Sequence, residues 1–360
     1  MKKILIAMCV ALSLAACDDS QKSDKPIIKI GVSLPLSGDL GYVGEPVKKS
    51  IELALRDISE QQNLKYDYKL IFEDDQLSPK KIVTNYSKFK SVDKVSAVMT
   101  IWSNANAISP RTEADKIINF GCAWGKTYAN GEYNFNNSIF SDEQDPMIIA
   151  EMKKHGVKKI GILYNQTAGD EELVAALIPS LKKSNFEIVF VRQFKMDQKD
   201  YKQDIASLKK IPVDVVFTTL ITPGLEIFHK QALEAGYTPE YTGYDIMTYA
   251  PQYFEGTYYL TDALATPKFL EHLKNNGIAA ATSCVVNTYD SLRMIVRGFE
   301  ETAPMDGAVI PVNEDVIKTI MNMRDFDSVA LGGVRMDSDG NVHTMPVLSI
   351  IKNGKPEPLK

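Results

Sequence analysis

Residues 28–57 read IKIGVSLPLSGDLGYVGEPVKKSIELALRD, and this stretch decides the fold class. The run at 28–34 is apolar and rich in branched residues, as expected of a buried β-strand. After a glycine-containing turn, apolar residues recur at helical spacing over residues 44–57, with Val47, Ile51, Leu53 and Leu55 on the buried side. A strand that turns directly into an amphipathic helix is the first half of a βαβ unit.

Strand-like and helical runs continue to alternate along the chain. Strands at 66–72 and 95–101 enclose a helix near 79–89. The pattern begins again at residue 158, with strands expected at 158–164, 187–194, 213–219 and 241–244 and helices from about 171 and at 201–209 and 223–235. Parallel strands need crossover connections, so this alternation predicts mostly parallel sheets covered by helices on both faces.

About 335 residues follow the export signal described below, more than one hydrophobic core normally serves, so we expect two lobes. Beyond Thr266 the sequence indicates further helical segments, the clearest at 283–301, and short strands around the turn Asp337–Asn341. The predicted division assigns residues 28–141 and 263–328 to the first lobe and residues 142–262 and 329–360 to the second. The linkers are therefore expected near residues 141, 263 and 328.

The amino terminus has the features of an export signal. Two lysines precede an apolar run, too short to span a bilayer, which ends in Leu14-Ala15-Ala16-Cys17. This ending resembles the bacterial lipobox, which implies that residues 1–16 are removed and that Cys17 is lipidated. The polar stretch 17–27 is expected to be a flexible tether, and Asp18 resembles an inner-membrane retention signal of enteric bacteria. We therefore expect a lipid-anchored protein in the periplasm or on the outer face of the plasma membrane.

Composition narrows the classes of function. The chain is 44% hydrophobic with a net charge of -5 and no long runs of one charge, which argues against nucleic acid or an anionic surface as partner. No stretch after the signal approaches the roughly 20 apolar residues of a transmembrane helix.

Cys122 and Cys284 are the two cysteines that remain once the signal is removed and Cys17 is lipidated. Two cysteines do not form a disulfide framework, so they stand either as one bridge or as two small buried thiols. We favour the buried thiols.

Motifs of catalysis and of cofactor binding are missing. The sequence contains no GxxxxGK[ST], HExxH, GxSxG or CxxC, and its four histidines are scattered. The glycine-rich turn 38–44 lacks the GxGxxG spacing that a dinucleotide requires, so we interpret it as the wall of a cleft. Asp337, Asp339 and Asn341 resemble the start of a calcium loop, but Leu348 stands where that loop needs its bidentate Glu, so a hairpin turn is favoured. We therefore expect no metal and no cofactor.

Open α/β sheets bind ligands just beyond the carboxyl ends of their strands. Both tryptophans of the chain fall at such places, where a flat apolar face with an indole N–H suits capture of a small molecule, although each could instead pack under a loop. The candidate ligand-binding residues at these strand ends are Trp102, Ser103, Asn104, Gly121, Ala123, Trp124 and Asp245.

Several motifs, read in order, resemble the branched-chain amino acid binding proteins of the type I periplasmic-binding-protein fold. The opening strand with Pro35-Leu36-Ser37-Gly38 resembles the family's first strand and loop, and Phe72-Glu73-Asp74-Asp75 resembles its acidic strand end. Tyr289-Asp290-Ser291 and the closing stretch from Gly333 to Asn341 resemble two further motifs. The likeness covers nearly the whole chain after the tether. It implies two lobes of parallel sheets joined by three crossovers, which open and close on a ligand.

The resemblance also implies roles for the candidate residues. In the family, a serine and main-chain or hydroxyl groups of one lobe hold the ligand carboxylate, and these places fall at Ser103, Gly121 and Ala123. An acid of the other lobe holds the ammonium, and its place falls at Asp245. The sequence departs from the family where Ala123 lacks a hydroxyl, where Trp124 is unusually bulky, and where Ile221 and Cys284 replace aromatic residues. The ligand is therefore expected to be an amino acid or a related polar, amide or aromatic molecule.

The favoured function is that of a solute-binding protein that delivers its ligand to an ABC permease. We expect a monomer that performs no chemistry. A ligand-sensing receptor that docks on a signalling partner is the alternative. A secreted hydrolase would need a histidine beside a cleft Ser or Asp, and none of His155, His229, His272 and His343 is predicted to lie there.

Overall fold

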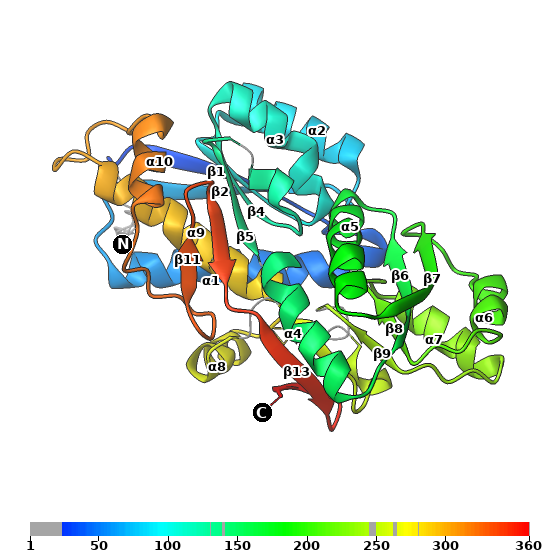
Figure 1. Cartoon of the computed structure of the whole chain (residues 1–360). Coiled ribbons are helices and arrows are strands. Elements are labelled where there is room, and N and C mark those ends of the chain that lie inside the picture. The colour runs from blue at the N-terminus through cyan, green and yellow to red at the C-terminus, as the bar shows by residue number, and fades with distance from the viewer. Residues whose placement is uncertain are drawn as a thin grey trace, which may run out of the picture.

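The structure is a computed structural model that describes residues 24–129, 131–138, 141–244, 250–261, 265–279 and 281–359. The predictions for the export signal, for lipidation of Cys17 and for Asp245 fall outside the described residues. Two lobes lie side by side, each built on its own main β-sheet (Figure 1). Among the described residues, no helix is both long and apolar enough to cross a bilayer.

The first lobe is built on a seven-stranded sheet in the order β11-β12-β5-β4-β3-β1-β2. Its strands pair in parallel except at the β11–β12 hairpin. The strands are β1 (Ile27–Leu34), β2 (Asp67–Asp74), β3 (Ala97–Ile101), β4 (Ile118–Cys122), β5 (Asn134–Ser138), β11 (Val334–Met336) and β12 (Asn341–Thr344).

Helices cover both faces of this sheet (Figure 1). On one face, α1 (Gly41–Gln61) packs beside α9 (Ser283–Thr302), and apolar residues such as Val47 and Ile295 join the strands in the largest hydrophobic cluster. On the other face, α2 (Pro79–Lys88) and α3 (Ser103–Asp115) bury Ile82 and Ile108 in a separate cluster. A parallel sheet with both faces covered is the architecture that the sequence predicts.

The second lobe contains a parallel four-stranded sheet in the order β7-β6-β8-β9 and a smaller antiparallel sheet in the order β10-β13-β14. A parallel bridge between Tyr244 and Leu260 joins the edges of the two. The strands are β6 (Lys159–Asn165), β7 (Glu187–Phe194), β8 (Val215–Thr218), β9 (Tyr241–Gly243), β10 (Tyr258–Thr261), β13 (Val347–Lys352) and β14 (Lys355–Pro358).

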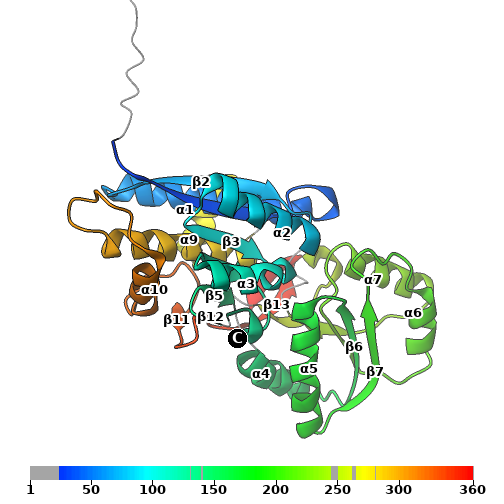
Figure 2. The ribbon, with the colours of Figure 1, turned by 90° about the horizontal axis from the view of Figure 1, so that it is seen from above.

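Helices again cover both faces of the four-stranded sheet. The helices α4 (Ser141–Lys154) and α5 (Ala168–Lys183) pack on one face, and α6 (Lys202–Leu208) and α7 (Gly224–Glu234) on the other. Figure 2 shows this lobe beside the first one, with α5 on the side nearer to α3. Two further α-helices, α8 (Pro267–Asn275) and α10 (Asn313–Met321), belong to the first lobe and bury Phe269 and Val316 in its main cluster.

The main elements of the sequence prediction are confirmed. The strands expected at 28–34, 187–194 and 241–244 and the helix at 283–301 agree with the structure within one or two residues. The favoured hairpin at Asp337–Asn341 is also confirmed, since the carboxylate of Asp337 accepts the amides of Asp339 and Asn341 at 2.9 and 3.0 Å. The sequence analysis did not predict α3, β5 or α4.

One part of the predicted division of the chain is wrong. We expected residues 329–360 in the second lobe, with a linker near residue 328. Instead, β12 pairs in parallel with β5 in the first sheet, and Met336 and Val342 contribute to the first lobe's core. The last crossover into the second lobe lies between β12 and β13, at residues 345–346.

The favoured prediction that Cys122 and Cys284 are two buried thiols is also wrong. Cys122 and Cys284 form a disulfide, with their Cα atoms 5.7 Å apart although 162 positions separate them in the chain. Cys122 ends β4 and Cys284 lies in the first turn of α9, which crosses the sheet beneath it. Sequence spacing cannot report this meeting, because it depends on how α9 packs.

The acidic strand end explains why the loop after β1 has a fixed shape. Oδ1 of Asp74 accepts the amides of Leu36, Ser37 and Gln76 at 2.9, 3.3 and 3.1 Å, and its Oδ2 accepts the hydroxyl of Ser37. Gly44 closes the same loop, since a Cβ there would lie 2.1 Å from the carbonyl oxygen of Pro35. The loop and the acidic motif therefore form one structural unit.

The hydrogen bonds of Asp74 predict a pH dependence. Burial on its own would raise the pKa of Asp74, but the Ser37 hydroxyl and the amides of Leu36, Gln76 and Ser37 outweigh it and hold the pKa below its usual range. A lowered folded-state pKa gives stability that is present above the unfolded value of about 4 and is lost as the pH falls through the folded value.

The free energy of unfolding of the variant Asp74→Asn should therefore be about 1 kcal/mol lower than that of the wild type at pH 7. This gap between the two proteins should close below about pH 4. Urea denaturation of both proteins between pH 3 and 7 measures the gap. A gap that stays constant over this range would show that the charge of Asp74 does not stabilise the loop.

Candidate functional site

The candidate site lies where the carboxyl ends of the strands of both lobes approach each other. Trp102 follows β3, Ser103 and Asn104 open α3, and Trp124 follows β4 in the first lobe. In the second lobe, Asn165 ends β6 and Thr219 follows β8. The structure therefore gathers the described first-lobe candidates at one edge of the first sheet, as the sequence predicts.

Trp102 lies between the two lobes. Its half-buried side chain packs against the main hydrophobic cluster of the first lobe and also against the second-lobe cluster around Leu220 and Ile221. Its backbone adopts φ 56° and ψ −148°, a conformation that is strained for any residue other than glycine. The amide of Trp102 donates to the carbonyl of Cys122 at 2.8 Å, and this bond helps to hold the strained backbone.

Trp124 faces the second lobe. Its half-buried side chain packs against both hydrophobic clusters of that lobe. A Cβ on Gly169, in the first turn of α5, would lie 3.3 Å from the carbonyl oxygen of Trp124 and 3.5 Å from its Cβ. Trp124 therefore packs between the lobes and does more than fill space under a loop of its own lobe.

Gly121 and Ala123 both have close contacts within the first lobe. The ring of Tyr128 covers Gly121, and a Cβ there would lie 2.4 Å from the ring, so a packing requirement accounts for this glycine. The amide of Ala123 donates to Oδ1 of Asn136 at 3.1 Å, and its carbonyl accepts from Nδ2 of Asn136 at 2.7 Å. Both main-chain groups of Ala123 are therefore bonded to Asn136.

Leu40 and Tyr42 contact the second lobe, and the sequence analysis did not predict these contacts. Leu40 packs against the second-lobe cluster, and the hydroxyl of Tyr42 donates to the carbonyl of Thr222 in the second lobe at 2.9 Å. Burial is the main cause that raises the pKa of the Tyr42 phenol, so it stays protonated and able to donate. The prediction of the 38–44 turn as a cleft wall was the only clue to these two residues.

Buried polar groups lie near the carboxyl ends of β6 and β8 in the second lobe. Nδ2 of Asn165 donates to the carbonyl of Thr219 at 2.8 Å. Asp170 is bonded to Thr167, the cap of α5, and Thr219 lies beside it. Burial raises the pKa of Asp170 to about 7 despite these hydroxyls, so its carboxyl is partly protonated near neutral pH.

The histidines lie in other environments. His272 is 2.6 Å from Asp57, His343 is 2.8 Å from Asp337, and His229 is 3.3 Å from the hydroxyl of Tyr241. His155 stacks on Tyr258 and lies 3.3 Å from Glu151. Within the described parts of the chain, no group of three or more His, Cys, Asp or Glu is placed to hold a metal ion.

The chain matches one protein-family model and is similar in sequence to several known proteins. The family model described as "Periplasmic binding protein" matches residues 27–355. A Leu/Ile/Val-binding protein of Citrobacter freundii is 25% identical over 248 residues, which cover 67% of this chain and 66% of that protein. A Leu/Ile/Val-binding protein homolog 7 of Brucella suis is 21% identical and is matched over 62% of its length and 66% of this chain. The chain thus matches slightly less than two thirds of the length of these relatives.

Solved structures show the same fold. A leucine binding protein from Thermotoga maritima matches with a TM-score of 0.80 at 17% identity, covering 92% of this chain and 98% of that one. A solute binding protein from R. palustris in complex with benzoate matches with a TM-score of 0.81 at 18% identity, covering 92% of this chain and 95% of that one.

The bond between Tyr42 and Thr222 predicts an effect on the spacing of the lobes. Replacement of Tyr42 by Phe removes the hydroxyl and should lower the ratio of closed to open molecules about fivefold, which corresponds to about 1 kcal/mol. The mean radius of gyration from small-angle X-ray scattering should rise.

Tyr66→Phe is the matched control, because the Tyr66 hydroxyl donates to the carbonyl of Val309 within the first lobe. It should lower the melting temperature without changing the radius of gyration. Equal scattering from wild type and Tyr42→Phe would mean that the bond to Thr222 does not hold the lobes together.

Proposed function

Because the chain belongs to the periplasmic binding protein family, we propose that it is an extracytoplasmic solute-binding protein of an ABC importer. It encloses one small molecule between its two lobes and delivers that molecule to a membrane permease without changing it. The observation that carries this proposal is the placement of Trp102 against the apolar clusters of both lobes. A side chain in this position senses both the ligand and the closure of the lobes.

The ligand that fits this site is a small carboxylate with an apolar body. Leu40, Trp102, Trp124 and Ile221 supply apolar surface from both sides. The first amides of α3, at Ser103 and Asn104, are donors at a helix amino terminus, where a carboxylate is favoured. Isoleucine and benzoate, which occupy two of the similar solved structures, both have this character.

Asp245 decides between these two kinds of ligand in the proposal. A carboxylate there would pair with the ammonium of an amino acid and would disfavour an acid that carries no positive charge. Ala123 and Trp124 remove a hydroxyl and add an aromatic face relative to the family pattern, which favours a flat or bulky apolar body.

The proposed location follows from the amino terminus. The lipobox-like ending at Cys17 and the polar tether favour a protein held at a membrane by a lipid on Cys17, and Asp18 favours the outer face of the plasma membrane. We propose that the protein is a monomer there. We propose that the first lobe comprises residues 28–138 and 265–344 and that the second comprises residues 141–261 and 347–359. These bounds replace the predicted ones because of the strand pairing of β12 and β13.

A ligand-sensing receptor is the second candidate, because the same closure of two lobes could be read by a signalling partner instead of a permease. A permease and an ATPase encoded beside this chain would favour import, and a chemoreceptor or kinase would favour sensing.

The first test is a thermal-shift screen of residues 18–360 without lipid, with isoleucine and benzoate as probes and with amides and polyamines as further classes. A ligand that binds only the folded state adds about 2.7 kcal/mol at 100 times its dissociation constant, which is a shift of a few degrees for a chain of this size. We expect a shift with at least one carboxylate probe. A shift with amides or polyamines alone would contradict the proposed ligand class.

The second test separates the two carboxylate classes. Asp245→Ala should weaken binding of isoleucine about 100-fold, because it removes the counter-charge of the ammonium, and it should leave benzoate binding unchanged or stronger. Calorimetric titration measures both. Asp197→Ala, at an exposed position in the loop after β7, is the control and should change neither. Unchanged binding of an ammonium-bearing ligand by Asp245→Ala would remove Asp245 from the site.

A further inference from the structure

We infer that the Cys122–Cys284 disulfide and Asn136 are positioning residues, which hold Trp102 and the segment 123–125 in the geometry that ligand capture requires. This inference rests on the proposed function. It assigns the disulfide a role in the site beyond the general stabilisation of the fold that any buried bridge provides.

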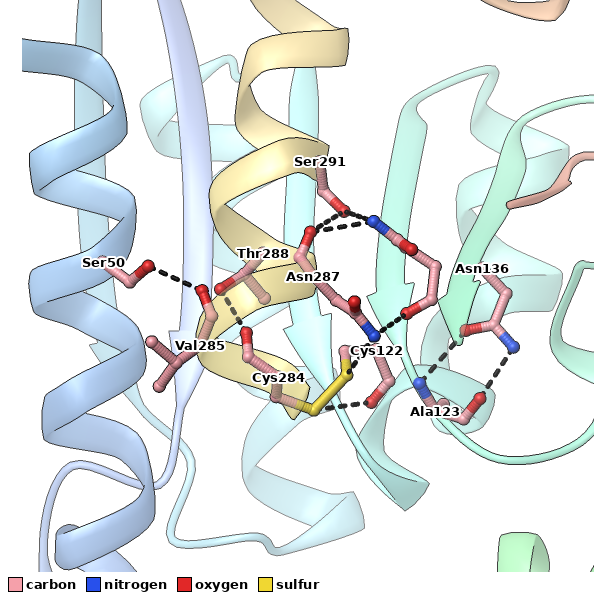
Figure 3. Close-up of a disulfide and its surroundings, with 10 residues drawn as sticks. Ser50, Cys122, Ala123, Asn136, Cys284, Val285, Asn287, Thr288 and Ser291 are labelled. Atoms are coloured by element: carbon pink, nitrogen blue, oxygen red, sulfur yellow. Dashed lines mark hydrogen bonds between the residues drawn. A yellow bond between two sulfur atoms is a disulfide. The ribbon is translucent and has the colours of Figure 1, made fainter. Parts of the chain in front are cut away.

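The disulfide joins the edge of the site to a rigid part of the first lobe. Cys122 is the last residue of β4, and Cys284 lies in the first turn of α9; both are 2% exposed. That turn is anchored independently, since the hydroxyl of Ser50 in α1 donates to the carbonyl of Val285 at 2.6 Å (Figure 3). A cross-link to an anchored turn restricts the end of β4 more than a cross-link to a mobile loop would.

A pair of asparagines fixes the same helix to the sheet. Nδ2 of Asn137 in β5 donates to the carbonyl of Asn287 at 2.9 Å, and Nδ2 of Asn287 donates to the carbonyl of Asn137 at 3.0 Å. Nδ2 of Asn137 also donates to the hydroxyl of Ser291 at 3.3 Å. The partner of Cys122 is thus tied to both α1 and β5.

Through its carbonyl, Cys122 also holds Trp102. The Trp102 amide donates to this carbonyl, and the φ of 56° at Trp102 is one that a tryptophan does not hold without such support. If the end of β4 were free to move, the backbone of Trp102 would relax toward an unstrained conformation. The indole, which reaches the second lobe, would then be displaced.

Asn136 holds the residues that follow Cys122. It is fully buried, and besides the two bonds to Ala123 its Nδ2 donates to the carbonyl of Gly125 at 3.2 Å. A Cβ on Gly125 would lie 2.5 Å from Oε2 of Glu172 in α5, so this segment is also where the second lobe packs closely. A small shift of residues 123–125 would therefore change both the wall of the site and the contact between the lobes.

The test compares three variants of the full mature chain. Cys122→Ala with Cys284→Ala removes the bridge, and Asn136→Ala removes the support of Ala123 while the bridge remains. Asn119→Ala is the matched control at the other end of β4. Its Nδ2 donates to Oδ1 of Asn134 at 2.9 Å in a similar buried network.

The first readout needs no ligand. The chain has two tryptophans, Trp102 and Trp124. The amide of Trp102 bonds to the carbonyl of Cys122, and Trp124 lies two residues after Cys122, so intrinsic tryptophan emission reports on this segment. In the double cysteine variant and in Asn136→Ala, we expect the emission maximum to move to longer wavelength and acrylamide quenching to rise. Asn119→Ala should show the wild-type spectrum. Circular dichroism confirms that each protein is folded.

The second readout is the affinity for isoleucine or benzoate, whichever binds the wild type. It should fall at least tenfold in the double cysteine variant and in Asn136→Ala, and less than twofold in Asn119→Ala. Folded variants with wild-type emission and affinity would overturn the inference, as would equal losses in Asn119→Ala.

The two proposals can fail separately. If the wild type binds neither probe, the proposed ligand class is wrong, while the emission spectra still decide whether the disulfide and Asn136 position the tryptophans. If the double cysteine variant does not fold, Asn136→Ala and wild type reduced with tris(2-carboxyethyl)phosphine provide the same comparison. Wild-type emission from both would then overturn the inference.

Discussion

Parallel pairing of neighbouring strands is the constraint on which the rest of this structure depends. In a parallel sheet, every strand ends at the same edge, so the residues that follow β1, β3 and β4 meet although the chain separates them by tens of positions. The same holds for β6 and β8 in the second lobe. Because these two edges face each other, each lobe contributes one half of the candidate site.

Polar side chains hold the loops at these edges. Asp74 accepts the amides of the loop after β1, and Asn136 binds both main-chain groups of Ala123. A loop that must keep one shape without regular secondary structure needs such partners for its amides and carbonyls. The loops can then present apolar side chains such as Trp102 and Leu40 to the opposite lobe.

The sequence predicted elements well where a local pattern determines them. The apolar run at 28–34 and the amphipathic run at 44–57 lie inside β1 and α1. The sequence did not predict β5, whose residues NFNNS include four polar residues out of five, all of them buried. Those asparagines are buried because they bond to other elements, as Asn134 does to Thr112 and Asn137 to Asn287. Hydrophobic periodicity contains no information about such partners.

By itself, the sequence determined the α/β class, the two lobes, and the strand ends at which Trp102 and Trp124 lie, because periodicity and turn chemistry are local properties of the chain. Only the tertiary structure decided that Cys122 is bridged to Cys284, that β12 pairs with β5 in the first lobe, and that Tyr42 reaches Thr222. Each of these joins segments far apart in the chain. The packing of whole helices and sheets brings such segments together, and no local pattern specifies which ones will meet.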